Sequence, residues 1–378
     1  MKESYTVEGF IHKVGKHCES SALRDMFEFY GFPMSEAMAF GLDGTMGFGF
    51  FDLSEGNLNY DDLKAPLFIG GKQDTINPNS LACRLLGLNL RKQSFSSAEK
   101  AWEESKKLLI QEIPLIIQAD LNFLNYMNLQ ADIHFGGHFI TLAGYDETKG
   151  IAFVGDSEFE GFQEIEISLL KKARSSNFGP SYMRPNNVQY SMQIRADGKR
   201  PPFGAGLKLA ISKVVNNMLH SSLSNNGLNG MKKFANNILE WDEKLKGNIE
   251  NHMKDQSTSL AKMTFEMIYG YIEEWGTGGA CFRNLYNSFL NELLYHNNLR
   301  ESLSLWSRVE FEIIEEILPL IKNSAAKWTK FATILKNAAD RYKNDCLNHV
   351  NLVKLSNMVL DIQLEEQSIF KKLSKIKI

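Results

Sequence analysis

The sequence predicts an α+β protein with a mixed N-terminal half and an all-helical C-terminal half. Before about residue 200, glycines are frequent and short β-type runs alternate with helical ones, whereas later apolar residues recur at helical spacing. Two prolines and three glycines fall in the segment RADGKRPPFGAG at 195–206, which marks a boundary or hinge. We therefore predict two domains, 1–200 and 201–378, consistent with a chain of 378 residues.

The first predicted helix spans residues 19–30. Its apolar residues share one face, and they are Ala22, Leu23, Met26, Phe27 and Tyr30. Gly31 suits a left-handed C-terminal cap, and Pro33 follows it to stop the helix. A second N-terminal helix is predicted over 97–111.

Short apolar runs bounded by turn residues predict strands in the same half, at 65–69, 114–120 and 188–194. The runs FITLAGYD (139–146) and IAFVGDS (151–157) are separated by ETKG, with Gly150 in the turn. This pattern is typical of a β-hairpin, so we expect an antiparallel sheet.

Helical periodicity dominates the second half, at 231–241, 259–275, 282–296, 309–321, 327–344 and 352–373. The sequence GTGG at 276–279 interrupts two of these helices. Pro319 is expected to kink or end its own helix.

Composition excludes several classes of protein. Lys and Arg total 42 and Asp and Glu total 45, which gives a net charge of −3. The chain therefore lacks the excess of positive charge that non-specific nucleic-acid binding requires. No apolar run is long enough for a transmembrane helix, and the N-terminus lacks the apolar stretch of a signal peptide, so we expect a cytoplasmic protein. The four cysteines form no CxxC pair, which argues against a zinc ribbon or a disulfide scaffold.

Cys18 lies at the predicted start of the first helix, in the sequence His17-Cys18-Glu19-Ser20. A thiol there meets unpaired backbone N–H groups and the positive end of the helix dipole, and both favour the thiolate. From this position alone, a small core cysteine remains the alternative.

His138 and Asp156 lie at opposed ends of the predicted hairpin. His138 opens one apolar strand after two glycines, and Asp156 follows the returning strand. Because the turn lies midway between them, the carboxylate should reach the imidazole, and the imidazole should reach a thiol on a helix packed against the sheet. The sequence thus predicts a Cys–His–Asp site with nucleophile, base and orienting carboxylate.

This chain order resembles that of the papain-like cysteine enzymes, and the closer resemblance is to the butirosin biosynthesis protein H family. The similar segments are 17–48, 119–146, 227–241 and 276–292, and because they fall in both halves the resemblance extends over most of the chain. The resemblance implies a papain-like fold, with the helix that carries Cys packed on the antiparallel sheet, followed by a helical domain. It assigns Cys18 as nucleophile, His138 as base and Asp156 as the orienting group, where papain has Asn.

Other site residues follow less directly. The backbone N–H of Cys18 is expected in the oxyanion hole. Papain's second donor is a glutamine six residues before the nucleophile, a position held here by His12, for which a surface role is the alternative. His17 adjoins the nucleophile and is a candidate to help polarise it or to line the cleft, with a side chain that points elsewhere as the alternative.

Three more polar residues have both a functional and a structural interpretation. Asp120 and Tyr126 match family positions and are candidates for the cleft wall, with strand-end capping and packing as the alternative. Arg283, after GTGG, is a candidate to reach over the cleft from the helical domain, with a helix-surface role as the alternative. Asp132, His134 and His138 have metal-ligand spacing, but the intervening Phe-Gly-Gly indicates a loop, so no metal or other cofactor is expected.

In that family the site is understood to move an acyl group from a carrier-protein thioester to an amine. The resemblance therefore implies an acyltransferase of antibiotic or nonribosomal-peptide biosynthesis, of the kind that the closthioamide amide synthetase represents. Its partners would be a phosphopantetheinyl carrier protein and a small amine, and the helical domain would serve as lid or acceptor wall. A peptidase or amidohydrolase and a non-catalytic binding protein remain alternatives, and the oligomeric state stays open.

Overall fold

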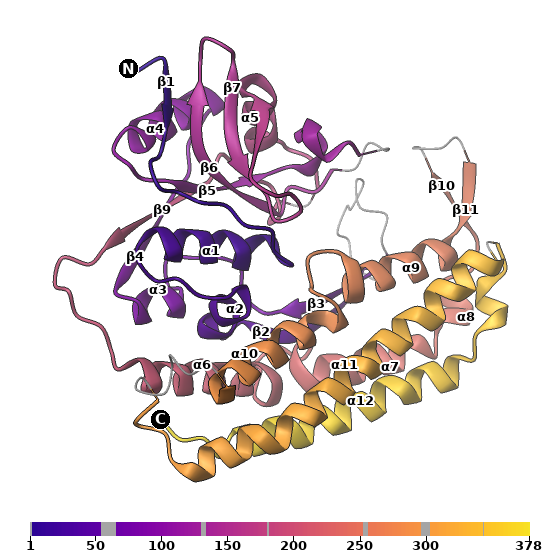
Figure 1. Cartoon of the computed structure of the whole chain (residues 1–378). Helices are drawn as coiled ribbons and strands as arrows, with labels where there is room; N and C mark the ends of the chain where they lie inside the picture. The colour runs from indigo at the N-terminus through magenta and orange to yellow at the C-terminus, as the bar shows by residue number, and fades with distance from the viewer. Residues whose placement is uncertain are drawn as a thin grey trace. The chain divides into compact units, whose positions relative to one another are not determined.

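The computed structural model describes residues 2–53, 66–129, 134–179, 181–251, 256–295, 303–342 and 344–378. Its strands are β1 Ser4–Thr6, β2 Met46–Asp52, β3 Leu67–Lys72, β4 Leu88–Gln93, β5 Leu115–Ala119, β6 His138–Asp146, β7 Ile151–Gly155, β8 Phe162–Glu166, β9 Gln189–Ile194, β10 Asn248–Asn251 and β11 Gln256–Ser259. Its helices are α1 Cys18–Phe29, α2 Glu36–Asp43, α3 Leu81–Leu85, α4 Ala98–Leu109, α5 Ile167–Ser175, α6 Phe203–Leu219, α7 Gly227–Ile238, α8 Trp241–Lys244, α9 Leu260–Tyr269, α10 Arg283–Tyr295, α11 Arg308–Tyr342 and α12 Leu352–Leu373. The predicted α+β class is confirmed (Figure 1).

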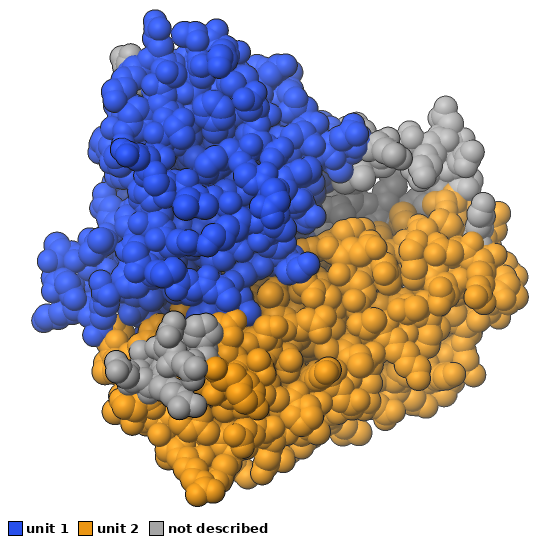
Figure 2. All heavy atoms as spheres, viewed as in Figure 1, with its two compact units in different colours: residues 1–39, 60–64, 76–200 blue, residues 40–59, 65–75, 201–378 orange. Residues whose placement is uncertain are grey.

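The chain folds into two compact units (Figure 2). The first contains residues 1–39, 60–64 and 76–200, and the second contains 40–59, 65–75 and 201–378. One division between the units falls between Arg200 and Pro201. The segment around β2 and β3, by contrast, belongs to the second unit instead of the first.

An antiparallel sheet forms the centre of the first unit, in the order β4-β9-β5-β6-β7-β8. The short strand β1 pairs with residues 144–146 of β6. Strand β5 pairs with the earlier part of β6, residues 138–142. Helix α1 packs against β6, and α4 and α5 cover the opposite face (Figure 1). Because both faces are covered, eight of the nine residues of β6 are buried.

The predicted hairpin is present as β6 and β7. Asp146 pairs with Ile151 next to the turn, where Gly150 has a φ of 71° that suits glycine. The register shifts between Leu142 and Gly144, so the far ends of the two strands are offset. This hairpin fixes the positions of the residues at its open end.

The second unit is built from α6, α7 and α9–α12, with the β2–β3 hairpin packed on α6 and α7. Helix α11 runs unbroken through Pro319, contrary to the prediction that this proline and the following residues divide it into two helices. Pro319 and Glu315 are both exposed, so water can satisfy the Glu315 carbonyl that the proline deprives of a donor. Within the described ranges, no helix combines the length and apolarity that crossing a membrane requires.

Candidate active site

Cys18 is the first residue of α1, as the sequence predicted to within one residue. His17 has the extended backbone of an N-cap, and its Nδ1 accepts a hydrogen bond from the Ser20 backbone N–H at 3.3 Å. The His17 side chain therefore caps the helix. The sulfur lies at the helix start and is partly exposed, whereas the thiols of Cys83, Cys281 and Cys346 are buried.

Glu36, the first residue of α2, holds the chain that enters α1. Its Oε2 accepts from the Lys16 N–H at 2.7 Å, and its Oε1 accepts from the His17 N–H at 2.8 Å and from the Ser20 hydroxyl at 2.9 Å. These three hydrogen bonds fix the backbone immediately before the sulfur. Sequence reasoning missed Glu36, because nothing local to residue 36 indicates that it contacts residues 16–20.

The structure places His138 beside Asp156 and within electrostatic range of Cys18. His138 begins β6 and Asp156 follows β7, and His138 Nε2 lies 2.8 Å from Asp156 Oδ2. Cys18 is close enough to His138 to raise the pKa of the imidazole through its charge and through hydrogen bonding. His138 is 7% exposed and Asp156 is fully buried, so water screens their interaction little.

Charge coupling within this group shifts the pKa of both partners. Burial lowers the pKa of His138, but the charge and hydrogen bond of Asp156 and the contact with Cys18 outweigh it and raise that pKa to about 10. Burial raises the pKa of Asp156, but His138, the Glu158 N–H and Tyr126 outweigh it and lower that pKa below its usual value. The imidazole is therefore held as a cation beside an ionised carboxylate.

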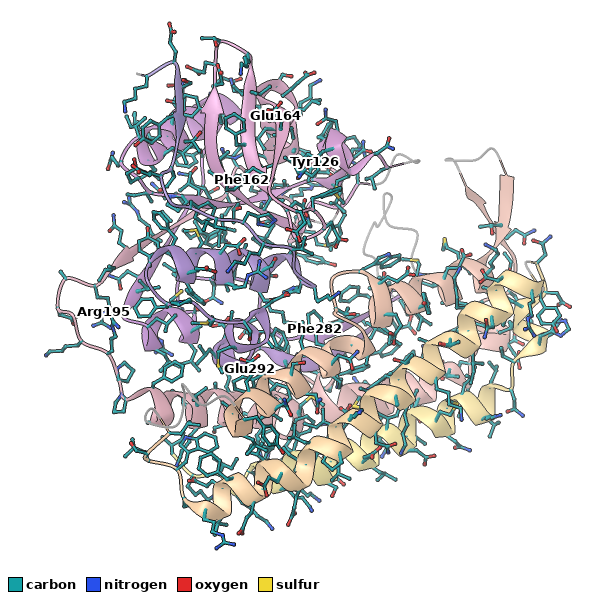
Figure 3. All side chains as sticks on the ribbon, viewed as in Figure 1. Tyr126, Phe162, Glu164, Arg195, Phe282 and Glu292 are labelled. Carbon is teal, nitrogen blue, oxygen red and sulfur yellow. The ribbon has the colours of Figure 1, made fainter. Side chains whose placement is uncertain are left out.

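Tyr126 donates a further hydrogen bond to the Asp156 carboxylate. It lies in the 3₁₀ turn Asn125–Met127 after β5 (Figure 3). Its hydroxyl donates to Asp156 Oδ2 at 3.0 Å. Burial and the neighbouring carboxylate raise the pKa of Tyr126 well above its ordinary value, so the phenol stays a donor. Its ring also meets Phe159 edge to face at 5.5 Å. The predicted candidate Tyr126 thus contacts the site through Asp156.

Asp120 does not line a cleft, because its side chain is fully buried and each oxygen accepts hydrogen bonds. Oδ1 accepts from the backbone N–H groups of Asn122 and Phe135, and Oδ2 lies 2.7 Å from His134 Nδ1 and accepts from Ser176 Oγ. Asp120 therefore fastens the loop before β6 to the end of α5, which agrees with the structural alternative.

The spacing that suggested a metal site does not bring its histidines to one centre. His134 Nδ1 is held by Asp120, whereas His138 Nε2 is held by Asp156, and Asp132 lies outside the described residues. Elsewhere in the described part of the chain, no group of three or more His, Cys, Asp or Glu side chains has a metal-binding arrangement.

His12 is neither an oxyanion donor nor a surface residue. It is 7% exposed, and both of its ring nitrogens are engaged: Nδ1 lies 2.7 Å from Asp25 Oδ2, and Nε2 lies 2.8 Å from the Asp156 carbonyl oxygen. No N–H of the ring is left for a substrate oxygen. The candidate oxyanion donor that remains from the sequence is the backbone N–H of Cys18, which opens α1.

Arg283 is buried in the second unit and has a structural role. Its guanidinium forms a two-point ion pair with Glu366, with contacts of 2.8 and 2.7 Å, and donates to the carbonyl oxygens of Cys281 and Gly47. The residues before it, Ala280 to Phe282, have φ values of 51°, 51° and 71°. The guanidinium thus holds a left-handed turn that non-glycine residues rarely adopt. Both predictions for Arg283, a cleft arm and a surface residue, were wrong.

Two family models match the chain. Residues 17–157 match the model for butirosin biosynthesis protein H, N-terminal, and this range contains Cys18, His138 and Asp156. Residues 168–373, more than half of the chain, match the domain of unknown function DUF4872. A search of curated proteins gives no match. The chain therefore belongs to the DUF4872 family, and its N-terminal region is one that matches butirosin biosynthesis protein H.

Proposed function

We propose that the protein is a cysteine-dependent acyltransferase that forms amides in natural-product biosynthesis. It would move an acyl or peptidyl group from a carrier-protein thioester to an amine through an acyl-Cys18 intermediate. The observation that carries the proposal is the buried contact of His138 with Asp156 on one side and with the partly exposed Cys18 on the other. A thiolate paired with an imidazolium is the nucleophile that such chemistry requires.

In the first half-reaction the Cys18 sulfur attacks the thioester carbonyl carbon. The bond from that carbon to the phosphopantetheine sulfur then breaks, and the leaving thiolate takes the proton of the His138 imidazolium. The backbone N–H of Cys18 stabilises the negative oxygen of the tetrahedral intermediate. The products are acyl-Cys18, a free carrier thiol and a neutral His138.

In the second half-reaction the amine nitrogen attacks the acyl-Cys18 carbonyl and gives its proton to His138. Collapse of the intermediate breaks the bond to sulfur, releases the amide and restores the thiolate–imidazolium pair. Acylation suits His138 to this step, because Cys18 contributes to the raised pKa of His138 and an acylated sulfur carries no charge. The imidazolium is therefore a weaker acid while Cys18 is a thiolate; acylation lowers its pKa, so it can protonate the leaving thiolate and then serve as a free base, while Asp156 orients it throughout.

A thioester donor explains why this reaction needs no cofactor bound to the chain itself. The carrier's phosphopantetheine brings an activated acyl group, so no nucleotide is consumed at this step. Water at about 55 M competes with the amine, and effective molarities of roughly 10⁵ M for a positioned amine overcome that competition. The helical half remains our candidate for the wall that binds the acceptor.

The test is an assay of the full chain with an acyl carrier-protein thioester and a panel of small amines, followed by mass spectrometry. We expect an amide product with wild type, none with Cys18→Ala, and an acyl adduct of the intact protein that accumulates in His138→Ala. Cys83→Ala, which removes a buried thiol from the same unit, is the matched control and should retain activity.

Three outcomes would contradict the proposal. Turnover retained in Cys18→Ala would exclude the covalent mechanism. Acyl release that is equally fast without amine would identify a hydrolase. A Cys18 that iodoacetamide does not alkylate in preference to the other thiols would favour a non-catalytic binding protein.

A further inference from the structure

We propose that His12 is a positively charged positioning residue that holds the turn carrying Asp156 against the helix carrying Cys18. This inference deepens the proposed function, and only its activity readout rests on that function. It concerns a residue outside the group of Cys18, His138 and Asp156, and it gives His12 a role other than oxyanion stabilisation.

The contacts of His12 join two segments that are far apart in sequence. Nδ1 lies 2.7 Å from Oδ2 of Asp25, which sits two turns along α1 from Cys18. Nε2 lies 2.8 Å from the carbonyl oxygen of Asp156 and 3.1 Å from that of Phe159. The ring therefore bridges α1 and the turn that follows β7.

Hydrogen-bond chemistry fixes the protonation of the ring. A carbonyl oxygen only accepts, so Nε2 must carry a hydrogen. Asp25 is ionised, because Arg24 donates to its Oδ1 from Nε at 2.9 Å and from Nη2 at 2.7 Å. Nδ1 must then also carry a hydrogen to bind the carboxylate, and His12 is an imidazolium.

Electrostatics agrees with this assignment. Burial lowers the pKa of His12, but the hydrogen bond and charge of Asp25, followed by the carbonyl oxygens of Asp156 and Phe159, outweigh it and raise that pKa above 6.5. The charged side chains that face the ring come from α1 and are Asp25 and, behind it, Arg24. From β8 the neighbour is the apolar ring of Phe162, whose centroid lies 6.3 Å from that of the imidazole.

The space for the ring depends on a glycine at the end of β7. A Cβ at Gly155 would lie 2.5 Å from His12 Cγ and 2.6 Å from its Nδ1, which no side chain tolerates. Gly155 therefore lets the imidazole lie directly under the backbone that leads into Asp156. In the sequence, the only sign of this close approach is that a glycine precedes Asp156.

The consequence is that Asp156 is held from two sides. His138 and Tyr126 bind its carboxylate oxygen, and His12 binds its backbone carbonyl. Removing the His12 contact releases the turn that follows β7 and weakens the hydrogen bond between Asp156 and His138. Because Asp156 raises the pKa of His138, a looser turn should lower that pKa.

The first measurement uses wild-type full-length protein labelled with ¹⁵N in its histidine rings. His12→Gln identifies the His12 signals by their loss. We expect both His12 nitrogens to carry hydrogen at about pH 7.5, whereas an unperturbed imidazole is mostly neutral there. A His12 ring with one unprotonated nitrogen at that pH would overturn the proposal, and this arm needs no variant to be active.

The second measurement compares His12→Gln with His12→Leu. Glutamine keeps an N–H for the Asp156 carbonyl oxygen but lacks the charge, and leucine lacks both. We expect the His138 titration midpoint to move lower by about one pH unit in the leucine variant and by less in the glutamine variant. The kcat of amide formation should fall roughly tenfold with leucine at little change in KM.

The matched control is His220→Gln, which changes an exposed histidine in the second unit and should match wild type in every readout. A leucine variant that unfolds at a lower temperature but keeps the wild-type His138 midpoint would show a merely structural role and overturn the proposal. The NMR readouts stand even if the protein forms no amide, so failure of the proposed function and failure of this inference are distinguishable.

Discussion

His138 Nε2 and Asp156 Oδ2 lie 2.8 Å apart at the open end of the β6–β7 hairpin. This contact orients the imidazole, because it commits Nε2 to the carboxylate. The hairpin alone brings the two residues together, and the turn at Gly150 and the register shift beyond Leu142 set their offset. Most of the site chemistry should therefore respond to changes at Asp156.

Asp156→Asn removes the charge but keeps an oxygen that can accept from His138. We expect the pKa of His138 to fall, because the Asp156 charge is the largest influence that raises it. On the alkaline side of the profile, activity should decline at a lower pH than in wild type. The kcat should also fall roughly tenfold to a hundredfold. The measurement is kcat between about pH 6 and pH 10.

Asp146→Asn is the matched control, because it changes a carboxylate at the closed end of the same hairpin. It should leave the pH profile in place. A profile for Asp156→Asn that superimposes on wild type would show that the carboxylate charge does not govern His138.

Tyr126→Phe removes the hydroxyl that donates to Asp156 Oδ2 and leaves the ring against Phe159. The hydrogen bond to a charged group is worth about 1.5–3 kcal/mol, but His138 and the Glu158 N–H still hold the carboxylate. We expect kcat to fall about threefold to tenfold with KM unchanged. Steady-state kinetics should show this split, and Tyr295→Phe, at an exposed tyrosine, should show no effect. A change confined to KM would indicate that Tyr126 contacts substrate instead.

The sequence made Cys18, His138 and Asp156 predictable because local patterns place each of them. A helix start places the thiol, and the two ends of one hairpin place the imidazole and carboxylate. Glu36 and Asp25 were missed because their roles depend on contacts with residues 16–20 and with His12, for which no periodicity exists. His12 itself was found by its spacing from the nucleophile, but its role was wrong because sequence does not show which acceptors surround a ring.

Local sequence patterns also could not predict that β2 and β3 belong to the second unit. Phe48 of β2 stacks on Trp328 at 5.5 Å, and the ring of Phe40 lies 5.3 Å from that of Phe282. The apolar runs of the hairpin are visible in the sequence, but the helices they pack against follow more than 150 residues later. Tertiary packing therefore decides which unit this hairpin joins, and the predicted boundary at residue 200 describes only the later part of the chain.

Iodoacetamide should label Cys18 ahead of the other three thiols in the folded protein. Cys18 is partly exposed and contacts His138, whereas burial raises the pKa of both Cys281 and Cys346 to about 11. Peptide mass spectrometry after brief treatment at about pH 7 should find one dominant adduct, and Cys18→Ala should lack it. In denaturant all four thiols should react at similar rates, which controls for peptide detection. Preferential labelling of Cys83 in the folded state would contradict the exposure of the site.

Global stability should fall between about pH 6.5 and pH 10 because of His138. Its pKa is raised from 6.5 to about 10 on folding, so the folded state binds a proton that the unfolded chain has lost across this range. The stabilisation is complete below the unfolded pKa and disappears as pH passes through the folded one. Asp156 acts in the opposite sense, since its lowered pKa gives stability that is lost as pH falls below 3.8.

Chemical denaturation at several pH values measures this slope. Wild type should lose a few kcal/mol of unfolding free energy across the alkaline range, and His138→Gln should have a flatter curve because it carries no titrating ring. A slope of the same sign should remain in His138→Gln, since the pKa of His12 is also raised on folding. His220→Gln should follow the wild-type curve. Parallel curves for wild type and His138→Gln would mean that the buried imidazole is not held as a cation, and the thiolate–imidazolium mechanism would lose its electrostatic basis.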